Sequence, residues 1–279
     1  MTEIGKVNTL SIVRETANGV YLDGGELGEI LMPQKFVTED YKNAGEVTVF
    51  VYTDSEDRLV ATTEEPKAMV GDFAFLEVNA VTKVGAFLDW GLPKDLLVPF
   101  SEQKIKLEAG KSYWVYVYLD LLTQRIAAST KLHKYLDNTP PEYLRGEEVD
   151  VIIIEESEIG YKTIVNREHS GILYKNQVFR DIQPGTEMKA YINKVRKDEK
   201  IDLILDKPGY GKTDTVADEI MARLKENNGF LAVSDKSSPE MIKHMFGVSK
   251  KTFKNAVGAL YKKRLIKFES DGIRLIGKG

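Results

Sequence analysis

The stretch DKPGYGKTDT, residues 206–215, contains the Gly-Lys-Thr triplet that ends a phosphate-binding loop. Such a loop needs a further glycine about five residues before Gly211, because the backbone must wrap closely around the phosphate. The chain has Asp206 there instead, and a carboxylate at that position repels phosphate. We therefore expect no nucleotide site and interpret the stretch as a domain connector, in which Asp214 or Thr215 caps the helix that follows.

The residue types that most often carry catalysis or bind metals are few and scattered. His133, His169 and His244 are the only histidines, they fall in three different segments, and cysteine is absent. No His-x-His or His-Glu spacing brings two ligands together. The acidic pair Glu155-Glu156 follows an apolar run and is typical of a strand end rather than of acid–base catalysis. We therefore expect no metal, no cofactor and no enzymatic activity.

The composition indicates the class of protein and the cellular compartment in which it works. The 279 residues are 42% hydrophobic and 29% charged, which is ordinary for globular domains. Without cysteine, disulfides and thiolate zinc sites are excluded. The first residues, MTEIGKVNTL, lack the basic and then apolar pattern of a secretion signal, and no long apolar run could span a membrane. We expect a cytoplasmic protein that does not bind membranes.

Charge is divided unevenly along the chain. Residues 212–279 hold 14 Lys and Arg against 8 Asp and Glu, a net charge of +6. Residues 1–211 hold 25 Lys and Arg against 35 Asp and Glu, a net charge of −10. A basic module on an acidic body indicates a polyanionic partner, although a lysine-rich helix is also commonly just solvated.

One sequence pattern occurs three times. Its first block reads GVYLDGGELGEILMP from Gly19, GAFLDWGLPKDLLVP from Gly85 and GYKTIVNREHSGILYK from Gly160. Its second block starts at Gly45, Gly110 and Gly185, which lie 26, 25 and 25 residues after the first. Such a repeat indicates one structural unit used three times.

Apolar residues alternate with period two inside each copy, and Gly, Asp and Asn fall between the runs. This pattern predicts short strands, which in the second copy are residues 72–82, 85–90, 95–98, 112–119 and 124–129. Five short strands in about 60 residues are expected to close into a small barrel, because a flat sheet of that size leaves exposed edges and too little core. The five-stranded OB fold is the candidate.

The second copy also resembles a known domain. Its segments VGAFLDWG and DLLVPFSE resemble the S1 RNA-binding domain, which is an OB-fold repeat, and the likeness is weaker in the first copy and weakest in the third. OB folds bind oligonucleotides mainly across their second and third strands. The resemblance implies that these barrels bind RNA there.

An outward-facing aromatic row is expected in SYWVYVYLD, residues 112–120. Because side chains alternate along a strand, the core-facing set is Val115, Val117 and Leu119, and the outward set is Trp114, Tyr116 and Tyr118. Aligning the repeats places Phe50, Tyr116 and Tyr191 in the same position. Such rings either stack on bases or pack against a neighbouring domain, and their place on the fourth strand favours packing.

The second and third strands supply the candidate RNA contacts, because single strands bind by stacking bases on aromatic rings while Lys or Arg side chains follow the phosphates. The second copy offers Lys83, Phe87 and Trp90. The third copy offers Tyr161, Lys162, Arg167, His169, Tyr174 and Lys175. The first copy is acidic in the matching region, with Asp23, Glu26 and Glu29, so we expect it to be structural or protein-binding.

The last quarter of the chain changes to helical periodicity, over residues 214–229, residues 237–247 and a segment from Ser249. A hairpin turning at Asp271-Gly272 follows. This order predicts a winged helix-turn-helix, whose helix from Ser249 can enter a major groove.

The candidate phosphate contacts on that helix and after it are Lys250, Lys251, Lys254, Lys262, Lys263 and Arg264. Few residues there could read base edges. The side chains expected to face inward are Phe253, Val257, Leu260 and Tyr261. A solvated or protein-binding surface is the alternative interpretation.

The expected fold class is mostly β and multidomain, with three OB barrels followed by an α+β winged-helix domain. The barrels span residues 1–65, 66–132 and 146–207, and the winged helix spans residues 215–279. Linkers are expected at residues 133–145, which contain Pro140-Pro141, and at residues 208–214.

This arrangement, with DKPGYGK before the last domain and DKSSPEMIKHMFGVSKKTFKNAVGALYKKRLI within it, resembles the bacterial conserved virulence factor B (CvfB) family over essentially the whole chain. The resemblance implies a cytoplasmic RNA-binding regulator that affects expression of virulence genes.

The leading hypothesis is non-enzymatic binding of single-stranded RNA through the barrels and the basic winged helix, with regulation after transcription. The alternative is a transcription regulator that binds duplex DNA through the winged helix and uses the barrels for protein interaction. The ribosome and other proteins stay open as further partners.

Overall fold

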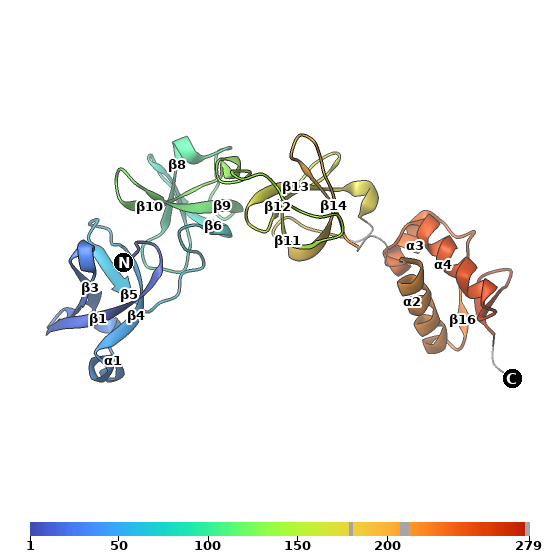
Figure 1. The fold of residues 1–279 in the computed structure, drawn as a ribbon, viewed down its shortest axis with the longest axis horizontal. Coiled ribbons are helices and arrows are strands. Elements are labelled where there is room, and N and C mark those ends of the chain that lie inside the picture. The colour runs from blue at the N-terminus through green and yellow to red at the C-terminus, as the bar shows by residue number, and fades with distance from the viewer. Residues whose placement is uncertain (179–180, 207–211, 277–279) are drawn as a thin grey trace. The chain divides into compact units, whose positions relative to one another are not determined.

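The computed structural model describes residues 1–178, 181–206 and 212–276 (Figure 1). The chain forms two compact units, Met1–Tyr135 and Leu136–Gly279. The first unit holds two β domains, and the second holds a third β domain and a helical domain. Residues 207–211, at the centre of the DKPGYGKTDT stretch and including most of the expected 208–214 linker, lie outside the described residues.

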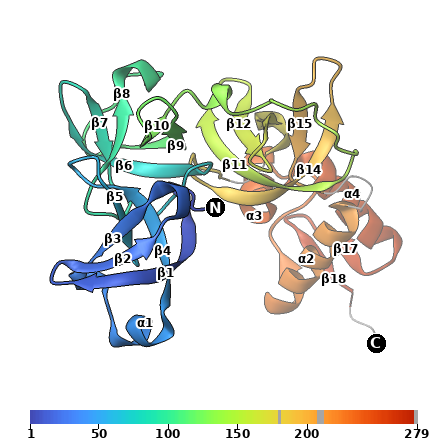
Figure 2. The same cartoon turned by 60° about the vertical axis from the view of Figure 1, so that its left-hand side comes forward.

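The first β domain is a closed barrel with strand order β1-β2-β3-β5-β4 (Figure 2). Its strands are β1 (Val7–Thr16), β2 (Gly19–Asp23), β3 (Glu29–Pro33), β4 (Glu46–Thr53) and β5 (Leu59–Thr62). The connections contain the short turns η1 (Gly25–Leu27) and η2 (Gln34–Phe36) and helix α1 (Glu39–Ala44). Parallel pairing of β3 with β5, at Leu31 and Val60, completes the barrel.

The third β domain repeats this topology, with closed strand order β11-β12-β13-β15-β14. Its strands are β11 (Glu148–Glu156), β12 (Gly160–Val165), β13 (His169–Tyr174), β14 (Glu187–Val195) and β15 (Ile201–Ile204), and the turn η5 is Lys175–Gln177. Here β13 and β15 form the parallel pair, from Gly171 and Ile201 to Leu173 and Leu203.

The second β domain has five strands in the order β10-β9-β6-β7-β8, but its sheet is not closed, so the prediction of a closed barrel is wrong here. Its strands are β6 (Phe73–Val81), β7 (Gly85–Leu88), β8 (Leu96–Pro99), β9 (Ser112–Asp120) and β10 (Arg125–Ser129), with turns η3 (Phe100–Glu102) and η4 (Leu132–Lys134). A loop residue bridges the open seam: the Glu102 carbonyl accepts from Thr130 N (3.0 Å) and its carboxylate accepts from Ser129 Oγ (2.7 Å).

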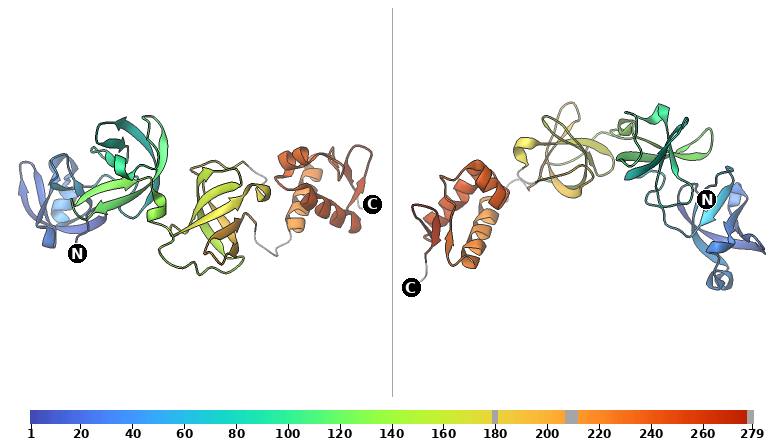
Figure 3. Two further views of the ribbon diagram at one scale, coloured as in Figure 1. Left: turned by 90° about the horizontal axis from the view of Figure 1, so that it is seen from above. Right: turned by 180° about the vertical axis from the view of Figure 1, so that it is seen from behind.

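The helical domain is a winged helix, shown in orange and red in Figure 3. Its elements are α2 (Lys212–Glu226), β16 (Phe230–Leu231), α3 (Pro239–Phe246), α4 (Lys250–Lys262), β17 (Ile266–Phe268) and β18 (Ile273–Leu275). Ser238 and Ser249 cap α3 and α4 by accepting hydrogen bonds from Met241 N (3.2 Å) and Thr252 N (3.1 Å). The predicted fold class is therefore confirmed: a mostly β, multidomain chain with a C-terminal winged helix.

Three details of this domain differ from the predictions. Helix α2 begins at Lys212, so Asp214 and Thr215, which were expected just before the helix, lie within it. The short strand β16, which pairs with β18, was not predicted. Tyr261 was expected to face inward but is 53% exposed, because it follows the buried Leu260 and lies about 100° around the helix from it.

The glycine that begins the second strand of each barrel lets two strands approach closely. A Cβ at Gly19, Gly85 or Gly160 would lie under 3.0 Å from the carbonyl oxygen of Met32, Val98 or Leu173 on the third strand. Real Cβ atoms do not approach so closely, so a larger residue forces the two strands apart.

Gly85→Ala is expected to destabilise the second barrel by about 1–3 kcal/mol more than Gly110→Ala, because overpacking adds that cost. Gly110 is the matched control, since it also has positive φ but nothing lies within 4 Å of its Cβ position. Urea unfolding followed by tryptophan emission reports on this domain, because both tryptophans, Trp90 and Trp114, are buried in it. Equal midpoints for the two variants would contradict the close approach.

Candidate nucleic-acid interface

One position on the second strand is equivalent in the three barrels and faces outward. Tyr21, Phe87 and Lys162 occupy it, and they pair with Leu31, Leu97 and Ile172 on the third strand. In the first two barrels the residues on either side are buried, so alternation turns this side chain away from the core. We call this position the slot, and it lies on the usual ligand face of an OB fold.

In the second barrel the slot residue Phe87 lies on an open, partly apolar surface. It is half-buried and pairs with Ala80 on β6 and Leu97 on β8. In the adjoining loop, Val84 is 51% exposed and Lys83 is exposed. Among the described residues, no carboxylate lies within ion-pair distance of Lys83 and no cation lies over the Phe87 ring. The arrangement can stack a base beside an ammonium that binds phosphate.

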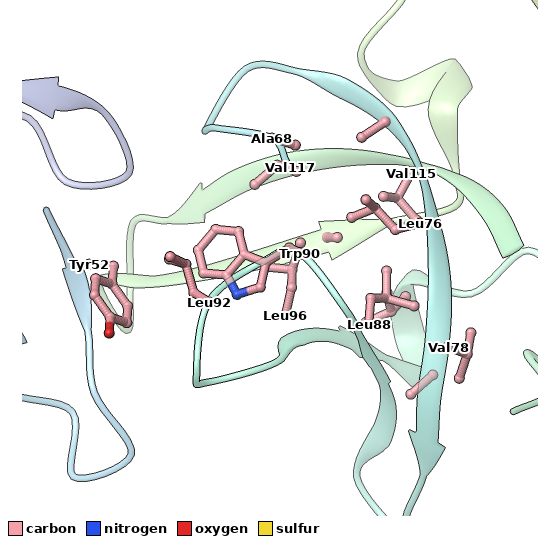
Figure 4. Packing of buried hydrophobic residues seen from close by; sticks show 14 of the residues in the cluster. Tyr52, Ala68, Leu76, Val78, Leu88, Trp90, Leu92, Leu96, Val115 and Val117 are labelled. Atoms are coloured by element: carbon pink, nitrogen blue, oxygen red, sulfur yellow. The ribbon is translucent and has the colours of Figure 1, made fainter. Parts of the chain in front are cut away.

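Trp90 does not belong to this surface, and the prediction that it contacts RNA is wrong. It is only 2% exposed, and its indole N–H donates to the Lys94 carbonyl (2.6 Å). Its ring packs edge-on against Phe50 and Tyr52 of the first barrel, with centroid distances of 5.8 and 6.4 Å. Figure 4 shows Trp90 and Tyr52 among the buried residues of this cluster. An aromatic ring in this setting stabilises the contact between two barrels.

The outward aromatic row on β9 also packs within the protein. Trp114 is 7% exposed, and Tyr116 stacks on Tyr135, with ring centroids 3.9 Å apart. Tyr118 lies 5.9 Å from the same Tyr135 ring. The register confirms that Phe50 and Tyr116 are equivalent, and Phe50 packs on Trp90 as described above. These rings pack against neighbouring segments, as their place on the fourth strand indicates.

His169, the third barrel's predicted histidine contact, is buried and cannot reach RNA. It is 3% exposed, and its Nε2 lies 2.8 Å from the Thr139 carbonyl. Because a carbonyl only accepts, Nε2 donates, and Nδ1 accepts from the Tyr143 hydroxyl at 3.0 Å. His169 therefore fastens the segment before β11, expected to be a linker, onto the barrel.

The three cations of the third barrel that were predicted to contact RNA are exposed but paired with carboxylates. The pairs are Lys162–Glu155 (3.1 Å), Lys175–Glu156 (2.6 Å) and Arg167–Glu187 (3.7 Å). The hydrogen bond with Glu156 raises the pKa of Lys175. Exposed pairs of this kind contribute about 0–1 kcal/mol, so a phosphate can compete for the cation.

The two predicted tyrosines of the third barrel are already engaged. Tyr161 is half-buried and packs against the barrel core. The Tyr174 hydroxyl accepts a hydrogen bond from Arg196 and lies 3.4 Å from the Asp202 carboxylate, which Arg196 also binds at 2.7 Å. The predicted cations and tyrosines of this face therefore already bind other side chains of the barrel, so fewer unpaired positive charges are present than the sequence indicates.

The winged-helix cations are arranged differently. Lys251, Lys254, Lys262, Lys263 and Arg264 are exposed, and Lys250 is half-buried. Within the described ranges, none of these six has a carboxylate partner. Arg264 has a φ of +56° and its N–H donates to the Tyr261 carbonyl (2.9 Å), which turns the chain sharply from α4 toward β17. These cations therefore carry positive charge that no described carboxylate neutralises through an ion pair.

Sequence reasoning missed three aromatic residues that lie at the surface: Tyr21, Tyr261 and Phe268. Tyr21 occupies the same slot as Phe87, which the alignment of Gly19 with Gly85 already implies. Tyr261 and Phe268 are 53% and 41% exposed, with ring centroids 5.2 Å apart. No sequence signal pairs them, because their contact depends on the turn at Arg264.

The described residues form neither a metal-binding cluster of acidic and histidine side chains nor a membrane-spanning helix. No group of three or more His, Cys, Asp or Glu side chains there is placed to hold a metal ion. No helix in those ranges is long and apolar enough to cross a membrane.

Comparison with known proteins agrees with this geometry. Residues 218–275 match the family described as the CvfB-like winged helix domain, and residues 4–64 match the S1 domain. Conserved virulence factor B of Staphylococcus epidermidis is 25% identical over 99% of this chain and 96% of its own length. The protein of the same name from Staphylococcus aureus is 27% identical over 99% of this chain and 95% of its own length.

The chain is similar to the conserved virulence factor B proteins over nearly its whole length. YitL of Bacillus subtilis, described as uncharacterized, is 27% identical over 92% of this chain and 89% of its own length. A crystal structure of a Streptococcus pneumoniae multidomain protein with nucleic acid binding domains is 24% identical, covers 98% of each chain and has a TM-score of 0.41. Because S1 barrels and winged helices are both nucleic-acid-binding folds, this architecture indicates a nucleic-acid-binding regulator.

The stack on Tyr135 predicts a loss of stability at high pH. Burial raises the pKa of Tyr135 to about 12, against about 10 in an unfolded chain. The folded state therefore keeps a proton that the unfolded state loses, so this stability is complete below about pH 10 and is lost as the pH rises to about 12.

Tyr135→Phe is expected to reduce the loss of folding stability between about pH 10 and pH 12. The measurement is the urea midpoint from the tryptophan emission maximum at a series of pH values between about 9 and 12. Tyr41→Phe, in the first barrel, is the control and is expected to follow the parent chain. A Tyr135→Phe curve parallel to the parent curve would contradict the burial of the Tyr135 hydroxyl.

Proposed function

We propose that this chain is a non-enzymatic, cytoplasmic regulator that binds single-stranded RNA and affects gene expression after transcription. The observation that carries the proposal is the set of winged-helix cations without carboxylate partners among the described residues. Such a cation neutralises a phosphate without breaking an ion pair, and the release of counterions drives binding. The name of the staphylococcal relatives, conserved virulence factor B, supports virulence genes as the regulated set.

Single strands suit the described surfaces better than duplexes do. Asn255 is the one side-chain amide in α4, so little on this helix could read base edges in a major groove. Phe87 beside Lys83 is instead the combination that stacks unpaired bases. The net charge of −10 over residues 1–211 also opposes a long duplex. The choice of RNA over DNA rests on the likeness of the barrels to S1 domains.

The third barrel is proposed as a further contact that forms when its ion pairs open. Lys162, Arg167 and Lys175 are exposed and held by exposed carboxylates. Phosphates replace those carboxylates at small cost. Binding there is therefore expected to be more sensitive to salt than binding through the stacked base on Phe87.

The first test compares a labelled oligouridine with a duplex DNA of similar length at near-physiological salt. Phe87→Ala is expected to weaken RNA binding by about 1–3 kcal/mol, or roughly 5- to 150-fold, because one stacked base is lost. Phe75→Ala is the matched control, since Phe75 is 45% exposed on β6 of the same barrel but packs beside Trp114. Equal effects of both variants would contradict the Phe87 site, and tighter duplex binding would assign the function to α4 as a DNA reader.

The winged helix is tested by the salt dependence of binding. Replacing Lys251 and Lys254 together by Ala is expected to reduce the slope of log K against log salt by roughly 1.4, because each single-strand phosphate contact contributes about 0.7. Replacing Lys225 and Lys236, which are exposed elsewhere in the domain, changes the charge equally and is expected to leave the slope nearly unchanged. Identical slopes for the two double variants would exclude α4 from the interface.

A further inference from the structure

The slot of the first barrel is covered by a neighbouring side chain. The guanidinium carbon of Arg14 lies 3.7 Å from the centroid of the Tyr21 ring. Arg14 is held in place by Glu29, whose Oε2 accepts from both Nε (3.0 Å) and Nη2 (2.8 Å). All three residues lie on the outward face formed by β1, β2 and β3.

This guanidinium occupies the place that a stacked base would take. A planar group 3.7 Å above an aromatic ring is in stacking contact with it. In the second barrel the equivalent Phe87 ring has no such cover within the described ranges. The first barrel therefore has the aromatic ring that base stacking requires, but the Arg14 guanidinium covers it.

The cover is weak enough to open. The side chains of Arg14 and Glu29 are 48% and 43% exposed, and an exposed pair of this kind shifts an equilibrium by about fivefold at most. Stacking one base is worth roughly 5- to 150-fold. A base therefore competes with Arg14 once the carboxylate no longer holds it.

The charges around the slot keep it closed in the parent chain. Asp23 on β2 lies directly opposite Glu29 on β3 in the strand register, and Glu26 lies in the turn between these strands. These carboxylates repel phosphate and attract the guanidinium. Loss of the Glu29 charge weakens both effects and frees Arg14 to contact a phosphate.

We propose that Tyr21 is a second base-stacking site for single-stranded nucleic acid, held closed by Arg14 and Glu29. The inference rests on the proposed function, because it requires that the chain binds single strands at all. It departs from the expectation that the acidic first barrel is only structural or protein-binding.

The test is photocrosslinking of a 5-iodouridine oligonucleotide to the full chain, since this base crosslinks to aromatic rings on which it stacks. Trypsin releases Tyr21 in the peptide of residues 15–35 and Phe87 in the peptide of residues 84–94. The measured quantity is the ratio of crosslinked 15–35 peptide to crosslinked 84–94 peptide. In the parent chain the 84–94 peptide is expected to dominate.

Glu29→Gln is expected to raise this ratio about two- to fivefold, which is the range of the lost ion pair. Glu26→Gln is the matched control, because it removes the same charge from the turn between β2 and β3 while the hydrogen bonds of Arg14 are to Glu29, and it is expected to raise the ratio less than Glu29→Gln does. Adding Tyr21→Ala to Glu29→Gln is expected to cancel the gain.

An unchanged ratio in Glu29→Gln would overturn the proposal. So would a rise in Glu26→Gln equal to that in Glu29→Gln, or equal crosslinking of both peptides in the parent chain. Crosslinks confined to winged-helix peptides in every variant would also overturn it while leaving the proposed function standing. The absence of any crosslink would refute the proposed function, and this proposal with it.

Discussion

The close approach of the second strand to the third, at the glycine that begins each repeat, is the constraint on which the rest of the structure depends. Gly19, Gly85 and Gly160 lie opposite Pro33, Pro99 and Tyr174, with no room for a Cβ. This contact sets the antiparallel register. A slip of one residue would turn every outward side chain of the second strand into the core, and the slot would disappear.

Because the register is fixed, the slot residue can change without changing the fold. Tyr21 is covered by an arginine, Phe87 is open, and Lys162 is paired with Glu155. The barrels therefore share one geometry and differ in the electrostatics of a few surface groups. The six cations on and after α4 have no carboxylate partner among the described residues, whereas Lys162, Arg167 and Lys175 do, so affinity depends on side-chain pairing more than on the number of basic residues.

The strands and most of the winged helix could be predicted from the sequence, because alternation, helical periodicity and capping residues are local signals. The errors at Trp90 and His169 have another cause. Alternation shows which way a side chain points, but the cover over it comes from distant residues, Phe50 and Thr139. The hydrogen bonds that bridge the open seam of the second barrel likewise come from Glu102, whose side chain has no strand pattern to reveal its role.

The packing around Trp90 makes one body of the first two barrels. Phe50, Tyr52 and Val60 belong to the same buried cluster as the core of the second barrel. Separating the first two barrels would expose Phe50 and Tyr52 on the first and Trp90 on the second. Exposed aromatic patches of this kind promote aggregation. Although the sequence repeats with the period of a single barrel, the smallest part of this region that evolution can move or lose intact is the pair.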